Sequence, residues 1–216
     1  MALNKPAPSP QAVQAFRGAL PAFLGGPTFG PVGAMANEVQ LSRFPILPTY
    51  DAVVGLKKVP EHDWQELFVL GLHDLRAGKD LNAARAAGWR CFSGAIPGPV
   101  VTGHVAFRKG LWRLTAITFG TRASDSLSDS QALDGLPQIQ NADYDLRFLR
   151  ISGLNLEVFW LVSQSGGNDL IVPSPSGPAQ LQSSLGKKRF FESPEFLSIV
   201  HALALNRLSY PATMGS

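Results

Sequence analysis

Two side chains able to take part in nucleophilic catalysis lie near the middle of the sequence. Cys91 is the single cysteine, and His104 follows it in a segment of alternating hydrophobicity. A thiolate attacks an electrophilic carbon when a neighbouring base accepts its proton, so these residues suggest Cys–His chemistry. However, Cys91 follows a predicted helix, whereas reactive thiolates usually lie at the positive N-terminal end of one. An enzyme of unrecognised type using Cys91, His104 and the 120–143 segment is therefore an alternative hypothesis.

A second candidate is a run of cations followed by two aromatic residues near the C-terminus. Lys187, Lys188 and Arg189 precede Phe190 and Phe191. Cations can bind phosphates while rings stack on bases, so this composition favours a polyanion or a nucleic acid. The simpler interpretation is a solvated linker followed by two core aromatics. Binding through Lys187, Lys188, Arg189 and Phe190 is kept as a second alternative, because a net charge of +3 is only mildly basic.

The sequence contains no pattern that names a cofactor, a metal or a reaction. It has no phosphate-binding glycine loop, nucleophile elbow or zinc-protease motif. His62 and His73 would share one face of a predicted helix, but about 16 Å of axial rise separates them, too far for one metal ion. Asp125, Asp129 and Asp134 offer oxygen ligands without the spacing of an EF-hand. We therefore predict no cofactor and no metal site.

The composition indicates a globular protein with few charges. Charged residues make up 16% of the 216, against about 25% in typical soluble proteins. Such a chain covers its surface poorly, which favours burial of some surface against a protein partner or a second copy. Residues 18–37 carry no charge, but three prolines interrupt them, so no membrane span is predicted. A single cysteine is typical of a reducing compartment, and we predict a cytoplasmic location.

The elements that must position these residues divide the chain into two parts. Residues 1–60 are rich in proline and glycine and predict an extended arm with a short helix near 11–23. Large apolar side chains such as Phe29 and Phe44 indicate that this arm wraps over a core. Residues 61–216 predict a single α+β domain. We expect a mostly antiparallel sheet of about five strands packed by helices.

Two helices are predicted at the start of this domain. Asp63 and Glu66 form a D-x-x-E capping pattern, and apolar residues then recur at helical spacing as far as Ala77. Gly78 is expected to end the helix. A second, alanine-rich helix is predicted over Leu81–Trp89.

Beyond Gly94 the hydrophobic period changes to two. Residues 100–107 and 111–119 predict two strands joined by a three-residue turn at 108–110. That register fixes which residues face one another across the hairpin. The expected pairs are Phe107 with Leu111 and His104 with Leu114.

The remainder of the chain predicts a long loop, three strands and a last helix. The loop covers residues 120–143, with one candidate helix at 128–133. Strands are predicted at 146–151, 156–163 and 170–172, and the last two form a hairpin. A helix begins at Ser193 and runs to about Ser209. No internal repeat is evident.

The strand at 156–163 is apolar on both faces, which predicts that both faces are covered. The expected covers are the helix at 63–77 and the last helix. The apolar arc of the last helix is itself wide enough to predict that it is nearly surrounded. From the low charge and the apolar arm we expect a non-catalytic structural or interaction subunit of a larger protein assembly.

Overall fold

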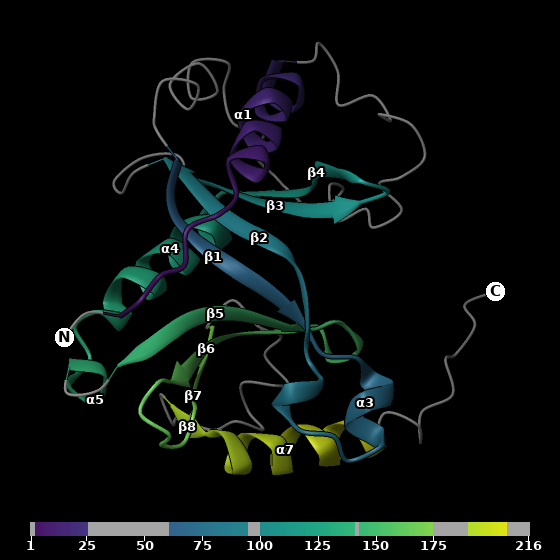
Figure 1. The fold of residues 1–216 in the computed structure, drawn as a ribbon, viewed down its shortest axis with the longest axis vertical. Helices are drawn as coiled ribbons and strands as arrows, with labels where there is room; N and C mark the ends of the chain where they lie inside the picture. The colour runs from purple at the N-terminus through teal and green to yellow at the C-terminus, as the bar shows by residue number, and fades with distance from the viewer. Residues whose placement is uncertain (1–2, 26–60, 95–99, 141–142, 175–189, 207–216) are drawn as a thin grey trace.

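A computed structural model of the chain describes residues 3–25, 61–94, 100–140, 143–174 and 190–206 (Figure 1). These residues form one eight-stranded sheet in the order β4-β3-β2-β1-β5-β6-β7-β8. The α+β class and the mostly antiparallel sheet are confirmed, but the expected number of about five strands is too small. The strands are β1 (Glu61–Val69), β2 (Arg85–Gly94), β3 (Val100–Arg108), β4 (Leu111–Phe119), β5 (Tyr144–Ile151), β6 (Leu156–Ser163), β7 (Leu170–Pro173) and β8 (Phe191–Glu192).

Helices cover both faces of this sheet. They are α1 (Pro10–Gly25), α3 (Leu72–Arg76), α4 (Thr121–Leu133), α5 (Pro137–Gln140) and α7 (Ser193–Asn206), with short 3-10 turns η2 (Leu81–Ala83) and η3 (Ser152–Leu154). One face, called the α4 face below, packs against α4 and α5. The opposite face packs against α1 at the β3–β4 end and against α7 at the β6–β8 end (Figure 1).

The sheet consists of two successive units with the same order of elements. In each unit, four strands pair as an antiparallel meander and a helix follows almost directly: β1 to β4 then α4, and β5 to β8 then α7. The first strands of the two units, β1 and β5, pair in parallel at the centre. The structure therefore contains a repeated arrangement that the sequence does not reveal.

The two helices predicted at 63–77 and 81–89 are largely wrong, because residues 63–69 belong to β1 and residues 85–89 to β2, and only residues 72–76, in α3, are α-helical. β1 pairs on both sides and is covered on both faces, so its apolar residues do not alternate strictly. Breaks in register after His62 and Leu67 hide the two-residue period further. In β2 the alanine-rich sequence favours a helix. The structure instead places this segment beside β3, where a Cβ on Gly88 would be 2.0 Å from the Val105 carbonyl oxygen. Gly88 is therefore a site of close backbone approach between two strands.

The predicted β3–β4 hairpin is present, with a different turn and register. The turn has two residues, Lys109 and Gly110, whose φ angles of 52° and 78° suit the tight hairpin turn that matches strand twist. The expected three-residue turn and its pairings are therefore wrong. An irregularity at His104 shifts the register once more. The observed pairs are Arg108 with Leu111, Phe107 with Trp112 and His104 with Ala116.

The segment 120–143, predicted as a loop, is largely helical. The candidate helix at 128–133 is the second half of α4. Its buried face includes serines as well as apolar residues, namely Ala123, Ser126, Leu127, Ser130 and Leu133. Because polar side chains occupy buried positions, hydrophobicity alone does not reveal the helical period.

The predictions for β5, β6, β7 and the cover of β6 are largely confirmed. Val158 and Trp160 pack in the cluster with α7, whereas Phe159 and Leu161 pack on the α4 face with Leu133. The second cover is thus α4, α5 and the start of the chain, not a helix at 63–77. α7 is less enclosed than predicted: its buried residues are Phe196, Val200 and Ala204, and Leu205 is 55% exposed.

Candidate functional site

A buried arginine lies where α4 packs on the sheet. Arg90 of β2 is 4% exposed, and its Nη2 donates a hydrogen bond of 2.5 Å to Ser126 Oγ of α4. The guanidinium carbon lies 3.9 Å from the ring centroid of Phe148 and 4.7 Å from that of Phe92. These rings provide cation–π contacts in place of a carboxylate. Burial lowers the pKa of Arg90 to about 10.

Several polar atoms around Arg90 are buried without a hydrogen-bond partner. Within the described residues, Arg90 Nε and Nη1 and Thr102 Oγ1 lack one, and so do Gln65 Oε1 and Asp129 Oδ2. Buried polar groups are normally bonded, and each exception requires an explanation such as strain, bound solvent or a ligand. Burial, followed by the charge of Asp125, raises the pKa of Asp129 to about 6. We call this group the buried polar layer.

The layer continues toward the start of the chain through a connected network. Gln65 Nε2 of β1 donates to Ser130 Oγ of α4 at 2.7 Å and to Asp63 Oδ2 at 3.2 Å. Ser130 Oγ donates to the same carboxylate, which forms an ion pair with Lys5 Nζ at 2.9 Å. Asn4 forms an isolated parallel β-bridge with Asp145 of β5, next to Lys5 of this network. These contacts fix the N-terminal segment and α4 to the sheet.

The two candidate catalytic residues do not come together. His104 of β3 faces Arg90 across the β2–β3 pair, on the α4 face. Cys91 is the next residue of β2, so its side chain points to the opposite face, where it packs with Phe16 of α1. Burial and then the charge of Arg90 lower the pKa of His104 to about 3. The histidine is thus neutral at physiological pH and separated from the thiol by the sheet.

Beside His104, the α4 face also carries an ion pair. Arg150 Nη2 of β5 lies 3.0 Å from Glu157 Oε1 of β6. Burial opposes ionisation of Glu157, but the charges of Arg90 and Arg150 outweigh it and lower its pKa. Glu157 therefore offsets part of the charge of Arg90 and Arg150 at the partly exposed edge of this face.

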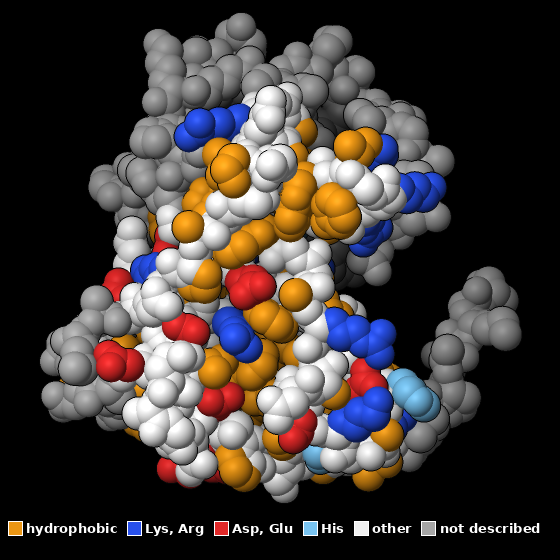
Figure 2. Space-filling view, viewed as in Figure 1, with side chains coloured by type: hydrophobic (Ala, Val, Ile, Leu, Met, Phe, Trp, Pro, Cys, Tyr) orange, Lys and Arg blue, Asp and Glu red, His pale blue; other side chains and the backbone are white. Residues whose placement is uncertain are grey.

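The β3–β4 hairpin ends in a bare tip, which we define as residues 107–113. Phe107 is 58% and Leu111 57% exposed, and the ring of Phe107 lies 5.4 Å from that of half-buried Trp112. Its cations Arg108, Lys109 and Arg113 are exposed, and residues 100–120 contain no Asp or Glu. In Figure 2, orange and blue side chains lie together over this end of the molecule.

The tip is bare because the hairpin extends beyond its covering helix. Phe16 and Leu20 of α1 pack with Val101 and Val105 of β3, but the turn lies to one side of α1 (Figure 1). Phe107 and Trp112 pair on the α1 side, whereas Leu111 pairs with Arg108 on the α4 face. Both faces of the hairpin are therefore open at its end.

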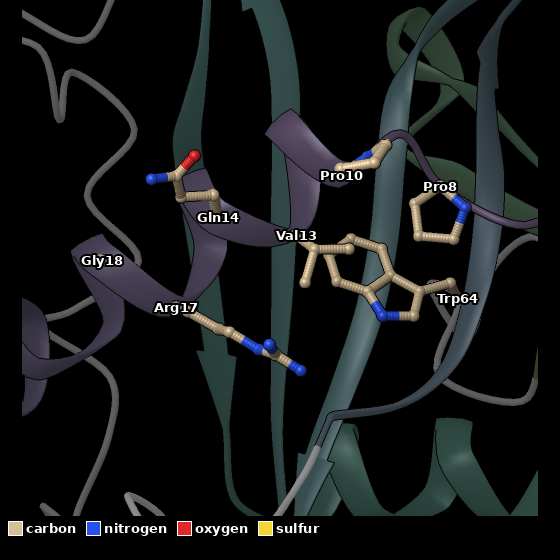
Figure 3. A pocket seen from close by; sticks show the side chains of 7 residues that line it. All are labelled: Pro8, Pro10, Val13, Gln14, Arg17, Gly18 and Trp64. Carbon is tan, nitrogen blue, oxygen red and sulfur yellow. The ribbon is translucent and has the colours of Figure 1, made fainter.

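A surface hollow of about 740 Å³ lies between α1 and Trp64 of β1 (Figure 3). Its lining consists of Pro8, Pro10, Val13, Gln14, Arg17, Gly18 and Trp64. Trp64 is held by an edge-on contact with Phe16 at 5.8 Å. Arg17 is the one ionisable residue in this lining, so the hollow lacks the paired groups of an acid–base site.

The predicted basic cluster is only partly described. Lys187, Lys188 and Arg189 lie outside the described residues, and Phe190 is half-buried just before β8. No group of three or more His, Cys, Asp or Glu in the described segments is arranged to hold a metal. Likewise, none of the helices in those segments is long and apolar enough to cross a bilayer.

Comparison of the chain with protein families, characterised proteins and solved structures gives no match. Sequence reasoning missed both the buried polar layer and the bare tip. A signal for the layer is the pair Ser126 and Ser130, one helical turn apart in a segment that also holds Leu127 and Leu133. A signal for the tip is the pattern Phe-Arg-Lys-Gly-Leu, in which cations fill a turn between two large apolar residues.

Proposed function

We propose that the protein is a non-catalytic interaction subunit that docks on a partner surface through the bare tip. The observation that carries this proposal is the exposure of Phe107 and Leu111, each more than half accessible at the end of an ordered hairpin. Exposed apolar residues that cluster, rather than scatter singly, mark interaction surfaces. Strand pairing of β3 with β4 continues to Arg108 and Leu111, so the backbone that carries these side chains loses less conformational entropy on binding than an unpaired loop would.

The arrangement of the ionisable groups supports a binding role over a catalytic one. Arg90 and His104 lie beneath α4, and Cys91 lies on the other face of the sheet. Catalysis by a nucleophile requires a base within hydrogen-bond reach, which this pair lacks. The Arg150–Glu157 ion pair likewise neutralises its own charges.

Photo-crosslinking in the cells that make the protein tests the proposal for any partner that the tip contacts. A photoreactive amino acid replaces Lys109 in the full chain, and the matched control replaces Gln131, an exposed residue of α4. We expect adducts from position 109 and few from position 131. The double substitution Phe107→Ser/Leu111→Ser, made in the chain that carries the probe at 109, should abolish those adducts.

Two results would contradict the docking role. One is an equal yield of adducts from positions 109 and 131, which would mean that the tip meets only random neighbours. The other is an unchanged yield when Phe107 and Leu111 are replaced, which would mean that their exposure serves no contact.

A further inference from the structure

The tip combines three large apolar residues with three cations, and residues 100–120 of the sequence contain no Asp or Glu. We infer that its partner is an anionic phospholipid surface, into which the end of the hairpin inserts shallowly. This inference rests on the proposed docking role of the tip. It names the chemistry of the surface that the tip meets.

The apolar residues are placed for a wedge rather than for a flat contact. Phe107 and Trp112 lie on one face of the hairpin and Leu111 lies on the other, so apolar side chains flank the turn on both sides. A wedge that is apolar on both sides suits a medium that surrounds it, such as the boundary between headgroups and acyl chains. Trp112 is half-buried behind the tip, and tryptophan is typical of that boundary.

The cations are placed to meet the headgroups. Arg108 and Lys109 stand at the turn, and Arg113 lies two residues beyond Leu111. Basic residues near an anionic leaflet are each attracted to it, and long side chains can reach headgroups while their stems stay apolar. No carboxylate between residues 100 and 120 offsets this attraction.

The same residues argue against two other binding partners of the tip. A second copy docking tip to tip would bring three cations against three, which repel one another. Single-stranded nucleic acid needs flat rings open for stacking, but Leu111 has none and Phe107 already leans on Trp112 at an angle of 58°. An apolar groove with acidic walls on another protein could also accept the tip, and the vesicle experiment distinguishes it from lipid.

Co-sedimentation of the full chain with lipid vesicles tests the inference. We expect roughly tenfold stronger binding to mixed phosphatidylcholine–phosphatidylglycerol vesicles than to pure phosphatidylcholine, because anionic lipid attracts the cations. Phe107→Ser/Leu111→Ser should weaken binding to the mixed vesicles about tenfold, since it removes the inserted groups. Arg108→Gln/Lys109→Gln should remove most of the preference for anionic lipid. The matched control is Leu205→Ser, which changes an equally exposed leucine of α7 and should have no effect.

The results separate failure of this inference from failure of the docking role. Absent vesicle binding, or binding that Leu205→Ser weakens as much as the tip substitutions do, would overturn the lipid partner. If crosslinks from position 109 then join a protein or a nucleic acid, the docking role stands with a different partner. If position 109 also gives no adducts, both proposals fall.

Discussion

Each unit of the sheet packs against the helix that follows it, α4 on one face and α7 on the other, but the two interfaces are filled differently. Beneath α7, Phe196 and Val200 pack on Trp160 and Ile171 in an apolar cluster. Beneath α4, serines meet Arg90 and Gln65, and several polar atoms lack partners. The α7 interface is thus stabilised by burial of apolar surface, whereas the α4 interface combines apolar contacts of Leu127 and Leu133 with buried hydrogen bonds and charge.

The units also differ in the length of their last two strands. β3 and β4 have nine residues each, whereas β7 has four and β8 has two. The long hairpin extends beyond its helix and leaves Phe107 and Leu111 bare. The same arrangement of elements therefore ends in a short, covered pair of strands in one unit and in an exposed hairpin tip in the other.

The largest expected effect is in the apolar interface. Phe196→Ala should lower the free energy of unfolding by about 4 kcal/mol, because it leaves a cavity in a fully buried cluster. Leu205→Ala on the same helix is the control and should change it by less than about 0.5 kcal/mol. Chemical denaturation measures both. A small loss for Phe196→Ala would mean that α7 does not anchor its unit.

The next effect is a pH dependence confined to the α4 face. The pKa of His104 is about 3 in the folded protein, whereas an exposed histidine has a pKa near 6.5. Below pH 6.5 the histidine therefore takes up a proton when the protein unfolds. Stability is therefore retained above pH 6.5 and lost as the pH falls. Between pH 7 and pH 4 the loss due to His104 should be about 3 kcal/mol, measured as the difference between the original chain and His104→Gln, because Asp129, whose pKa is raised to about 6, titrates in both proteins.

Denaturation at the two pH values measures that difference. Glu157, Arg90 and Arg150 also act on His104, and they are the same in both proteins. Their titration is therefore largely shared and does not account for a difference between them. An identical pH dependence in His104→Gln and the original chain would show that the histidine is charged or solvated in the fold.

A smaller effect is expected at Arg90. Its Nε and Nη1 are buried without hydrogen-bond partners, so replacing the guanidinium by an apolar side chain of similar length removes a desolvation cost that the Ser126 hydrogen bond and the ring contacts offset only in part. Arg90→Met should raise the free energy of unfolding by about 1 kcal/mol, as measured by denaturation. A loss of more than about 2 kcal/mol would show that bound solvent or a ligand satisfies the guanidinium.

Much of the second unit could be predicted from the sequence. Three local signals lie where the structure places their elements: the apolar run of residues 156–163, the Gly-Gly-Asn turn and the Ser-Pro-Glu start of the last helix. In the first unit, β1 is a central strand with breaks in register, so its apolar spacing imitates a helix. The burial of serines in α4 conceals that helix in the same way.

The placement of Cys91 and His104 and the exposure of the bare tip were harder to predict, because both depend on tertiary packing. Strand alternation decides on which side of the sheet Cys91 and His104 lie. Because the sequence predicts a helix at residues 81–89, it provides no register between Cys91 and His104. The exposure of Phe107 depends on where α1 stops covering β3, and no local pattern encodes that position. Turn composition predicts a hairpin and gives no indication that its end is bare.

The central claim is that Phe107 and Leu111 are kept at the tip for contact and not for folding. Chemical denaturation of Phe107→Ser/Leu111→Ser tests this claim most directly. Because both side chains are more than half exposed, we predict a free energy of unfolding within about 0.5 kcal/mol of the original chain. A loss of about 2 kcal/mol or more would contradict the claim, since it would place both residues in the core.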